Sequence, residues 1–177
     1  MYIGGVMLSV GTRAPDFAAR TTDGQMLTLS HLRGRPVVIY FYPHAFTPGC
    51  TAETRRFRDN YEELQHFGAE VIGISTDDHE KQCKFAEAEK VKFPLIGDKK
   101  AEIQALYDVK RPILSSNRRV TYVIDEEGVV AAVFHHEFQV LRHMDDVRLF
   151  FEKRLRSKSI EPRPPSTSRP PPLDPKK

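Results

Sequence analysis

The chain has 177 residues, of which 40% are hydrophobic and 29% charged, and its net charge is +3 at pH 7. This length suffices for one well-buried domain, and the composition gives no sign of a second. The positive excess lies in residues 157–177, which carry five basic and two acidic side chains, so residues 1–156 are neutral overall. A neutral body without a basic face argues against nucleic acid as a partner.

The two ends of the chain differ from its middle. Residues 1–10 are apolar but lack a basic leading segment and a long hydrophobic core, so we expect neither a signal peptide nor a membrane span. Residues 157–177 hold seven of the thirteen prolines, which predicts a disordered tail after a single domain over residues 1–156. The two cysteines form no disulfide framework, which fits a reducing compartment, and we expect a cytoplasmic monomer.

The first half of the chain predicts a buried strand followed by a helix. Val37–Phe41 is a short apolar, β-branched and aromatic run, as expected of a central strand buried on both faces. Pro48 then suits the first position of a helix. Phe57, Tyr61 and Leu64 recur at four and three residues, which predicts one helix of about four turns.

Further strands and helices alternate after this helix. Val71–Ile74 predicts a second buried strand, and the pair Asp77-Asp78 suits the start of a helix that continues to about residue 90. A weak strand at Phe93–Ile96 and a helix at Ala101–Tyr107 follow.

The last part of the domain predicts a hairpin and a closing helix. Val120–Ile124 and Val129–Phe134 flank the turn sequence Asp125–Gly128. An apolar stripe then marks an amphipathic helix that ends near Arg156; its members are Met144, Val147 and Phe151. The whole order predicts an α/β fold of three α/β/α layers with a mixed central sheet, as in the thioredoxin-like fold.

The loop after the first predicted strand carries the strongest chemical signal. It reads Pro43-His44-Ala45-Phe46-Thr47-Pro48-Gly49-Cys50 and delivers a single cysteine into the first turn of a helix. We expect Thr47 to be the N-cap. Free N–H groups at a helix N-terminus lower a cysteine pKa from about 8.5 toward roughly 3.5–7.5 and so favour the nucleophilic thiolate. The alternative from this segment alone is a buried, inert cysteine that only packs.

The spacing of Pro43, Thr47 and Cys50 resembles the active-site signature of the peroxiredoxins. The surrounding Thr-Pro-Gly-Cys-Thr-Ala-Glu is similar to the bacterioferritin-comigratory-protein, or Q, branch of that family. Five further blocks resemble the family in order: Val10–Phe17, Phe57–Asp59, Gly73–Asp77, Phe93–Asp98 and Arg119–Asp125. The resemblance covers most of the chain and also implies the thioredoxin-like fold.

The resemblance implies roles for three side chains around Cys50. The Thr47 hydroxyl would hydrogen-bond the thiolate or a peroxide oxygen, and Pro43 would shield the sulfur. The Arg119 guanidinium would lie beside the cysteine and stabilise both the thiolate and the charge that shifts across the O–O bond. Arg118 is a rival for this role, although the register of the strand favours Arg119.

Three other positions bear on how an oxidised Cys50 would be reduced. Glu53 stands where a Cys-x-x-Cys motif would need its second thiol, so a thioredoxin-type disulfide is excluded; a glutamate here would complement the helix dipole. Arg55 replaces the resolving cysteine that many members of the resembled branch carry. Cys83 is therefore the only candidate resolving thiol in the chain. The alternatives are that Cys83 only packs beside Ala86, or that an external thiol resolves Cys50.

Several histidines invite a metal interpretation. His44, His135, His136 and His143 lack a ligand-bearing cysteine or carboxylate at recognisable spacing, so we expect them to be solvated. Nothing in the sequence calls for a metal, haem or nucleotide cofactor.

The sequence and the resemblance together predict a cysteine-dependent peroxidase. Its Cys50 thiolate would reduce hydrogen peroxide or an organic hydroperoxide, and a thioredoxin- or glutaredoxin-like donor would restore it. The alternative from another class is a non-enzymatic redox sensor or chaperone-like binder of the same fold, with the proline-rich tail as a handle for a partner. Turnover separates the two, since a sensor is oxidised once per molecule.

Overall fold

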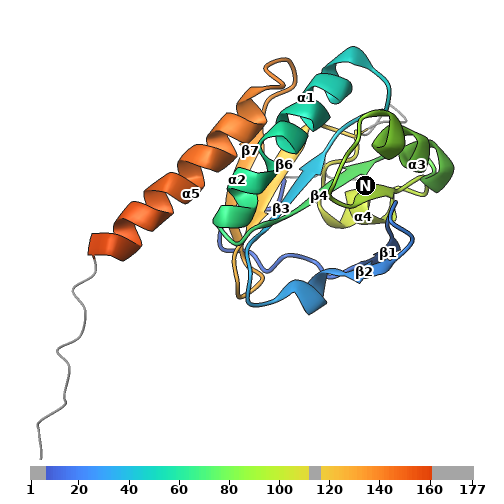
Figure 1. The fold of residues 1–177 in the computed structure, drawn as a ribbon. Helices are drawn as coiled ribbons and strands as arrows, with labels where there is room; N and C mark the ends of the chain where they lie inside the picture. Colours follow the sequence, from blue (N-terminus) through green and yellow to red (C-terminus); the bar gives the residue numbers. More distant parts are fainter. Residues whose placement is uncertain (1–6, 112–116, 161–177) are drawn as a thin grey trace, which may run out of the picture.

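A computed structural model describes residues 7–111 and 117–160 of the chain. Its centre is a five-stranded sheet with the order β5-β4-β3-β6-β7 (Figure 1). The strands are β3 (Val37–Phe41), β4 (Glu70–Ser75), β5 (Leu95–Gly97), β6 (Val120–Ile124) and β7 (Val130–His135). β3 pairs in parallel with β4 and antiparallel with β6, so the sheet is mixed, as predicted.

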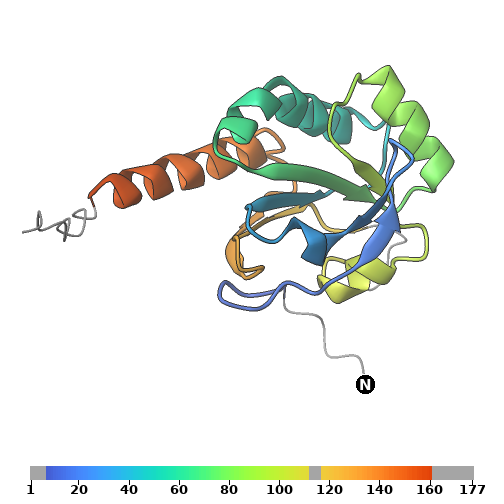
Figure 2. The same cartoon turned by 60° about the horizontal axis from the view of Figure 1, so that its bottom comes forward.

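Helices and a small hairpin cover the two faces of this sheet (Figure 2). The helices are α1 (Pro48–Asp59), α2 (Tyr61–His66), α3 (His79–Ala88), α4 (Glu102–Leu106) and α5 (Arg142–Ile160). β1 (Ala18–Arg20) and β2 (Met26–Thr28) form the hairpin, which leads into the 3₁₀ helix η1 (Leu29–Leu32). α1, α2, α3 and α5 lie on one face, and α4, the hairpin and η1 lie on the other. The predicted three-layer α/β fold is confirmed.

The alternation of side chains in β3 explains the two cores. Val38 and Tyr40 point into the cluster under α1, α3 and α5, whereas Val37, Ile39 and Phe41 point into the cluster under α4 and the hairpin. All five are at most 2% exposed. A continuous apolar run is what a central strand needs when both of its faces are covered, because successive side chains point to opposite sides.

The long helix predicted through Phe57, Tyr61 and Leu64 is in fact two helices. Asn60 lies between α1 and α2 with φ −109° and ψ 11°. Its side-chain amide donates to the Arg56 carbonyl at 2.7 Å, and its side-chain oxygen accepts from Arg148. An asparagine that hydrogen-bonds to the nearby backbone competes with regular helix geometry, which accounts for the break.

Two further differences from the predicted elements concern the ends of the domain. The β1–β2 hairpin was not predicted, although the turn sequence Asp23-Gly24 lies between its strands. α5 runs to Ile160 rather than ending near Arg156. Glu126 pairs with Arg154 at 2.5 Å and with Lys158 at 3.9 Å, and these contacts hold the last turns. Residues 161–177 of the predicted tail lie outside the described residues.

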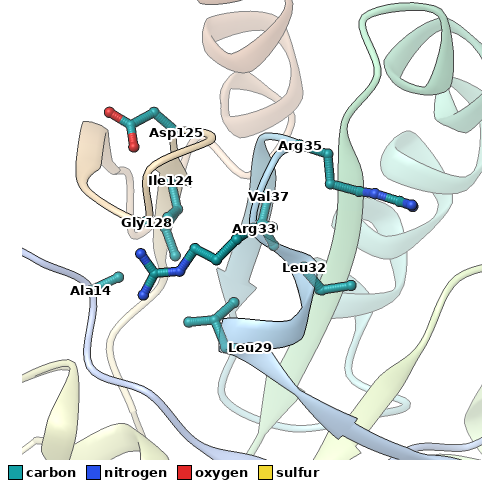
Figure 3. A pocket seen from close by; sticks show the side chains of 9 residues that line it. All are labelled: Ala14, Leu29, Leu32, Arg33, Arg35, Val37, Ile124, Asp125 and Gly128. Atoms are coloured by element: carbon teal, nitrogen blue, oxygen red, sulfur yellow. The ribbon is translucent and has the colours of Figure 1, made fainter.

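A small cavity lies where β3 begins and β6 ends (Figure 3). Its volume is about 10 Å³, room for roughly one water molecule. The Arg33 guanidinium packs against Gly128, whose φ of +80° and lack of a side chain permit this approach, because a Cβ at that position would collide with the guanidinium. This end of the sheet is therefore filled by packing.

None of the helices in the described part of the chain is both long and apolar enough to cross a membrane.

Candidate active site around Cys50

The polar residues singled out by the sequence lie at the other end of the sheet, away from the cavity beside Arg33. β3, β4 and β7 all end there, and β6 begins there. The register pairs Phe41, the last residue of β3, with Val120, the first of β6. The loop that follows β3 therefore lies beside Arg119, although 69 residues separate Arg119 from Cys50 in the chain. This register is what assembles the site.

Cys50 lies in the first turn of α1. Thr47 is the N-cap, with extended backbone geometry, and Pro48 is the first helical residue, as predicted. The Cys50 side chain is buried, with only 1% of the residue exposed. The Thr47 hydroxyl does not cap the helix but donates to the His44 carbonyl at 2.8 Å. Its oxygen lone pairs thus remain available as acceptors.

Arg119 brings a buried positive charge to the sulfur. Its Nη2 lies 3.4 Å from Cys50 Sγ, and its Nη1 donates to Glu53 Oε2. Glu137 makes two hydrogen bonds to Arg119. The Glu137 backbone carbonyl accepts from Arg119 Nε, and the Glu137 side chain accepts from the Arg119 amide, both at 3.4 Å. The neighbouring Arg118 is half-buried and is anchored through its amide, which donates to the Val109 carbonyl at 2.7 Å.

Glu53 is a site residue whose burial was not predicted from the sequence. The sequence predicted that it would complement the helix dipole, but it lies in the second turn of α1 and is fully buried. Burial raises its pKa to about 8, against the lowering effect of Arg119. The spacing of Cys50, Glu53 and Phe57, at three and four residues, places all three on one face of α1 and could have indicated this burial.

His143 corrects the expectation that the histidines are solvated. It is 0% exposed, and its Nδ1 lies 2.8 Å from the Thr121 hydroxyl and 3.9 Å from Glu53 Oε1. Burial lowers its pKa to about 4, so the ring is neutral. His135 does face solvent and pairs with Glu137 at 2.9 Å. In residues 7–111 and 117–160, no group of three or more His, Cys, Asp or Glu side chains is placed to hold a metal ion.

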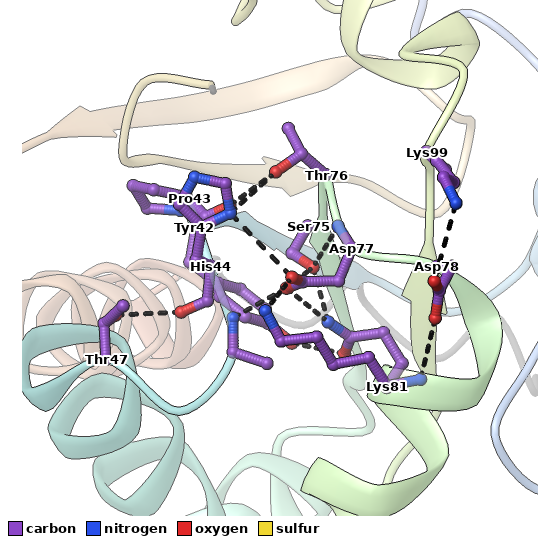
Figure 4. A network of polar contacts seen from close by, with 12 residues as sticks. Tyr42, Pro43, His44, Thr47, Ser75, Thr76, Asp77, Asp78, Lys81 and Lys99 are labelled. Atoms are coloured by element: carbon purple, nitrogen blue, oxygen red, sulfur yellow. Dashed lines mark hydrogen bonds and ion pairs between the residues drawn. The ribbon is translucent and has the colours of Figure 1, made fainter. Parts of the chain in front are cut away.

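The buried carboxylate of Asp77 ties the loop after β4 to the loop Pro43–Thr47, which precedes α1 (Figure 4). Asp77, 7% exposed, accepts from four groups: the Ala45 amide at 2.6 Å, the Ser75 hydroxyl at 2.8 Å, the Lys81 ammonium at 2.6 Å and the Gln82 amide at 3.2 Å. Thr76 adds a hydrogen bond from its hydroxyl to the Pro43 carbonyl at 2.7 Å. Pro43 itself is half-buried. The loop between β4 and α3 thus fixes the backbone between Pro43 and Thr47.

We expect Asp77→Ala to lower the free energy of unfolding by about 2–4 kcal/mol, because it leaves several buried donors without an acceptor. Burial acts to raise the pKa of Asp77, but the hydrogen bonds from Ala45, Lys81 and Ser75 outweigh it and the pKa is lowered. The carboxylate therefore contributes stability above the ordinary aspartate pKa of about 4, and that contribution is lost as the pH falls through the lowered value. Urea unfolding at several pH values measures the difference.

Asp78→Ala is the matched control for this prediction. Asp78 is exposed and caps α3 through the Lys81 amide at 2.9 Å. Its removal should cost less stability than the removal of Asp77. An equal loss of unfolding free energy in both variants would show that the buried contacts of Asp77 to the loop Pro43–Thr47 add no stability.

Cys83 lies in α3, away from the sulfur of Cys50. Its sulfur is 3.4 Å from His79 Nε2 and 4.0 Å from the Thr22 carbonyl oxygen, and both cysteines are free. The structure therefore does not bring the two thiols together. Arg55, at the position where many members of the resembled branch carry a resolving cysteine, is exposed and pairs with Glu89 at 2.6 Å.

Comparisons with known proteins identify the family of the chain. The model of the AhpC/TSA family matches residues 10–133. The chain is 40% identical over 140 residues to the chloroplastic peroxiredoxin Q of Oryza sativa subsp. japonica, which covers 78% of this chain and 64% of the rice protein. It is 39% identical over 137 residues to that of Sedum lineare, which covers 77% of this chain and 74% of the relative. The chain therefore belongs to the AhpC/TSA family of peroxiredoxins.

Solved structures narrow this assignment. Peroxidoxin BcpB from Mycobacterium tuberculosis is 37% identical, with a TM-score of 0.77 over 81% of this chain and 96% of that one. The bacterioferritin comigratory protein of Xanthomonas campestris is 26% identical, with a TM-score of 0.75 over 82% of this chain and 99% of that one. Within the family, the chain belongs to the peroxiredoxin Q and bacterioferritin-comigratory-protein branch. It spans 64% of the length of the rice relative.

Proposed function

We propose that the chain is a thiol peroxidase and that Cys50 is its peroxidatic cysteine. The observation that carries this proposal is the 3.4 Å contact between Arg119 Nη2 and the buried Cys50 sulfur at the start of α1. A fixed cation and a helix N-terminus both favour the thiolate, and the thiolate is the nucleophilic form.

In the proposed reaction, the Cys50 thiolate attacks the distal oxygen of a hydroperoxide. An S–O bond forms as the O–O bond breaks, so the sulfur loses two electrons and the peroxide gains them. With one proton taken up, the products are a Cys50 sulfenic acid and water or an alcohol. Arg119 would stabilise the negative charge that moves onto the leaving oxygen.

Thr47 and Pro43 would position the peroxide. Because the Thr47 hydroxyl already donates to the His44 carbonyl, its oxygen is free to accept the peroxide O–H. Pro43 would shield the sulfur from water, and its carbonyl is held by Thr76 at 2.7 Å. Hydrogen peroxide and organic hydroperoxides are the substrates that this arrangement would take.

A thiol must then condense with the sulfenic acid and release water. A disulfide needs Cα atoms within roughly 7 Å. For Cys83 to reach Cys50, α3 would open near residues 77–84. That opening would break the contacts of Asp77 and Gln82 and so release the Pro43–Thr47 loop as well. A thioredoxin- or glutaredoxin-like donor would finally reduce the disulfide.

We expect Cys83→Ser to react once with peroxide and then to accumulate sulfenic and sulfinic acid at Cys50, because its internal resolving thiol is gone. The wild-type protein should instead give a Cys50–Cys83 peptide and lose helical signal near residues 77–84. Peptide mass spectrometry and hydrogen exchange measure both. If Cys83→Ser cycles normally and the native protein yields no bridged peptide, Cys83 only packs and an external thiol resolves Cys50.

Turnover tests the proposed function itself. With excess peroxide, thioredoxin and thioredoxin reductase, each chain should consume many equivalents of peroxide. Consumption of a single equivalent would favour the redox sensor instead. A cytoplasmic location and a monomeric state stay predictions, and the plant relatives named above are chloroplastic.

A further inference from the structure

The two carboxyl oxygens of Glu53 have different surroundings. Oε2 accepts a hydrogen bond from Arg119 Nη1. Oε1 is buried without a hydrogen-bond partner and lies 3.9 Å from His143 Nδ1. A buried ionised carboxylate normally has hydrogen-bond partners for both oxygens. The unpartnered Oε1 therefore argues against an ionised Glu53.

The balance of charges around Arg119 also favours a neutral Glu53. The Arg119 guanidinium contacts both Glu53 and the Cys50 sulfur. Within residues 7–111 and 117–160, no other lysine or arginine side chain forms an ion pair with Glu53. Two anions in a site from which water is excluded are poorly compensated by one cation, and two such acids share a proton rather than both ionise.

His143 supplies no second cation. Its Nε2 lies 3.0 Å from the His136 carbonyl oxygen, which can only accept, so the ring proton is on Nε2. Nδ1 is therefore an acceptor, which the Thr121 hydroxyl occupies at 2.8 Å. The ring therefore carries no charge, and the lone pair of its Nδ1, which lies 3.9 Å from Glu53 Oε1, is already taken by Thr121.

We propose that Glu53 is a neutral carboxylic acid in the resting protein, and that it is a positioning residue that leaves the charge of Arg119 to the Cys50 thiolate. The first part stands on the contacts above; the second rests on the proposed function. The titratable groups that face Glu53 are Cys50 of α1, Tyr40 of β3, Arg119, Glu137 and His143 of α5. Of these, only Arg119 favours the ionised form of Glu53.

Ionisation of Glu53 then has a predictable effect. The pKa of Glu53 is raised to about 8, so this side chain should ionise between pH 7 and pH 9.5. Above this pKa, the carboxylate competes with the thiolate and the leaving oxygen for the Arg119 charge, so the peroxide reaction should slow. The rate should fall by about threefold or more between pH 7 and pH 9.5.

Glu53→Gln tests this proposal, because a glutamine keeps an oxygen for Arg119 and cannot ionise. Glu87→Gln, the same change at an exposed position of α3, is the matched control. At pH 6.5 the infrared spectrum of the wild-type and control proteins should contain the C=O stretch of a neutral carboxylic acid, which fades near pH 8 and is missing from Glu53→Gln. The alkaline fall in rate should also be missing from Glu53→Gln.

The spectra decide whether Glu53 is a neutral acid, and the rates decide whether it is a positioning residue. A wild-type spectrum without the band overturns the neutral acid, whatever the activity. A band that is present in a protein that never reduces peroxide leaves the neutral acid standing and rejects the proposed function. An alkaline fall that persists in Glu53→Gln overturns the positioning role. If Glu53→Gln does not fold, Asp98→Asn is the second variant, because Asp98 is the other buried carboxyl with a raised pKa among the described residues. A band that survives in Asp98→Asn and fades near pH 8 belongs to Glu53.

Discussion

Cys50→Ser is expected to abolish peroxide consumption while leaving the fold intact. The sulfur is the only atom at the start of α1 that can both form a stable anion beside Arg119 and accept an oxygen atom. Serine has nearly the same shape, so the buried packing around residue 50 should survive. Loss of peroxide in a steady-state assay, with an unchanged far-UV circular dichroism spectrum, is the expected pair of results.

Cys83→Ser is the matched control for that variant, because it removes the other thiol of the chain by the same substitution. It should still consume the first equivalent of peroxide. If Cys50→Ser keeps most of the activity, or if Cys83→Ser loses the first turnover, the nucleophile has been assigned to the wrong cysteine.

Arg119→Met is expected to slow the reaction of Cys50 with peroxide by about 10²–10³-fold, the usual cost of removing one donor that stabilises developing charge. Methionine roughly keeps the length of the side chain but removes the cation that is 3.4 Å from the sulfur. Both the thiolate and the leaving oxygen lose stabilisation. Stopped-flow measurement of the second-order rate constant tests this directly.

Arg118→Met offers a control one residue away. The Arg118 amide is bonded to Val109, and no contact joins its side chain to the sulfur within the described residues. Its rate constant should change little. A large loss confined to Arg118→Met would move the cationic role to that residue.

The sequence predicted the parts of the site that depend on local structure. Thr47 as the N-cap, Pro48 at the first helical position and Cys50 in the first turn all follow from short-range preferences, and the structure confirms that geometry. The apolar run Val37–Phe41 likewise predicted β3 to the residue. Local rules suffice where one segment determines the outcome.

The partners of Cys50 depend instead on sheet register. The pairing of Phe41 with Val120 brings Arg119 to the sulfur, and no local pattern encodes that pairing. The place of Arg119 beside Cys50 was therefore predicted only from the family resemblance. Glu53 and His143 were misjudged because polar residues are usually exposed, whereas here each completes a buried contact. For His143, its spacing of four residues from Val147 on the apolar face of α5 was the available signal.

The most direct test of the central claim is peptide mass spectrometry after one equivalent of hydrogen peroxide, with dimedone present to trap sulfenic acid. The account predicts that every oxidised product contains Cys50, either as the trapped sulfenic acid or in a bond to another thiol. Peroxide consumption that leaves Cys50 unmodified, with oxidation confined to Cys83 or to methionine, would contradict it.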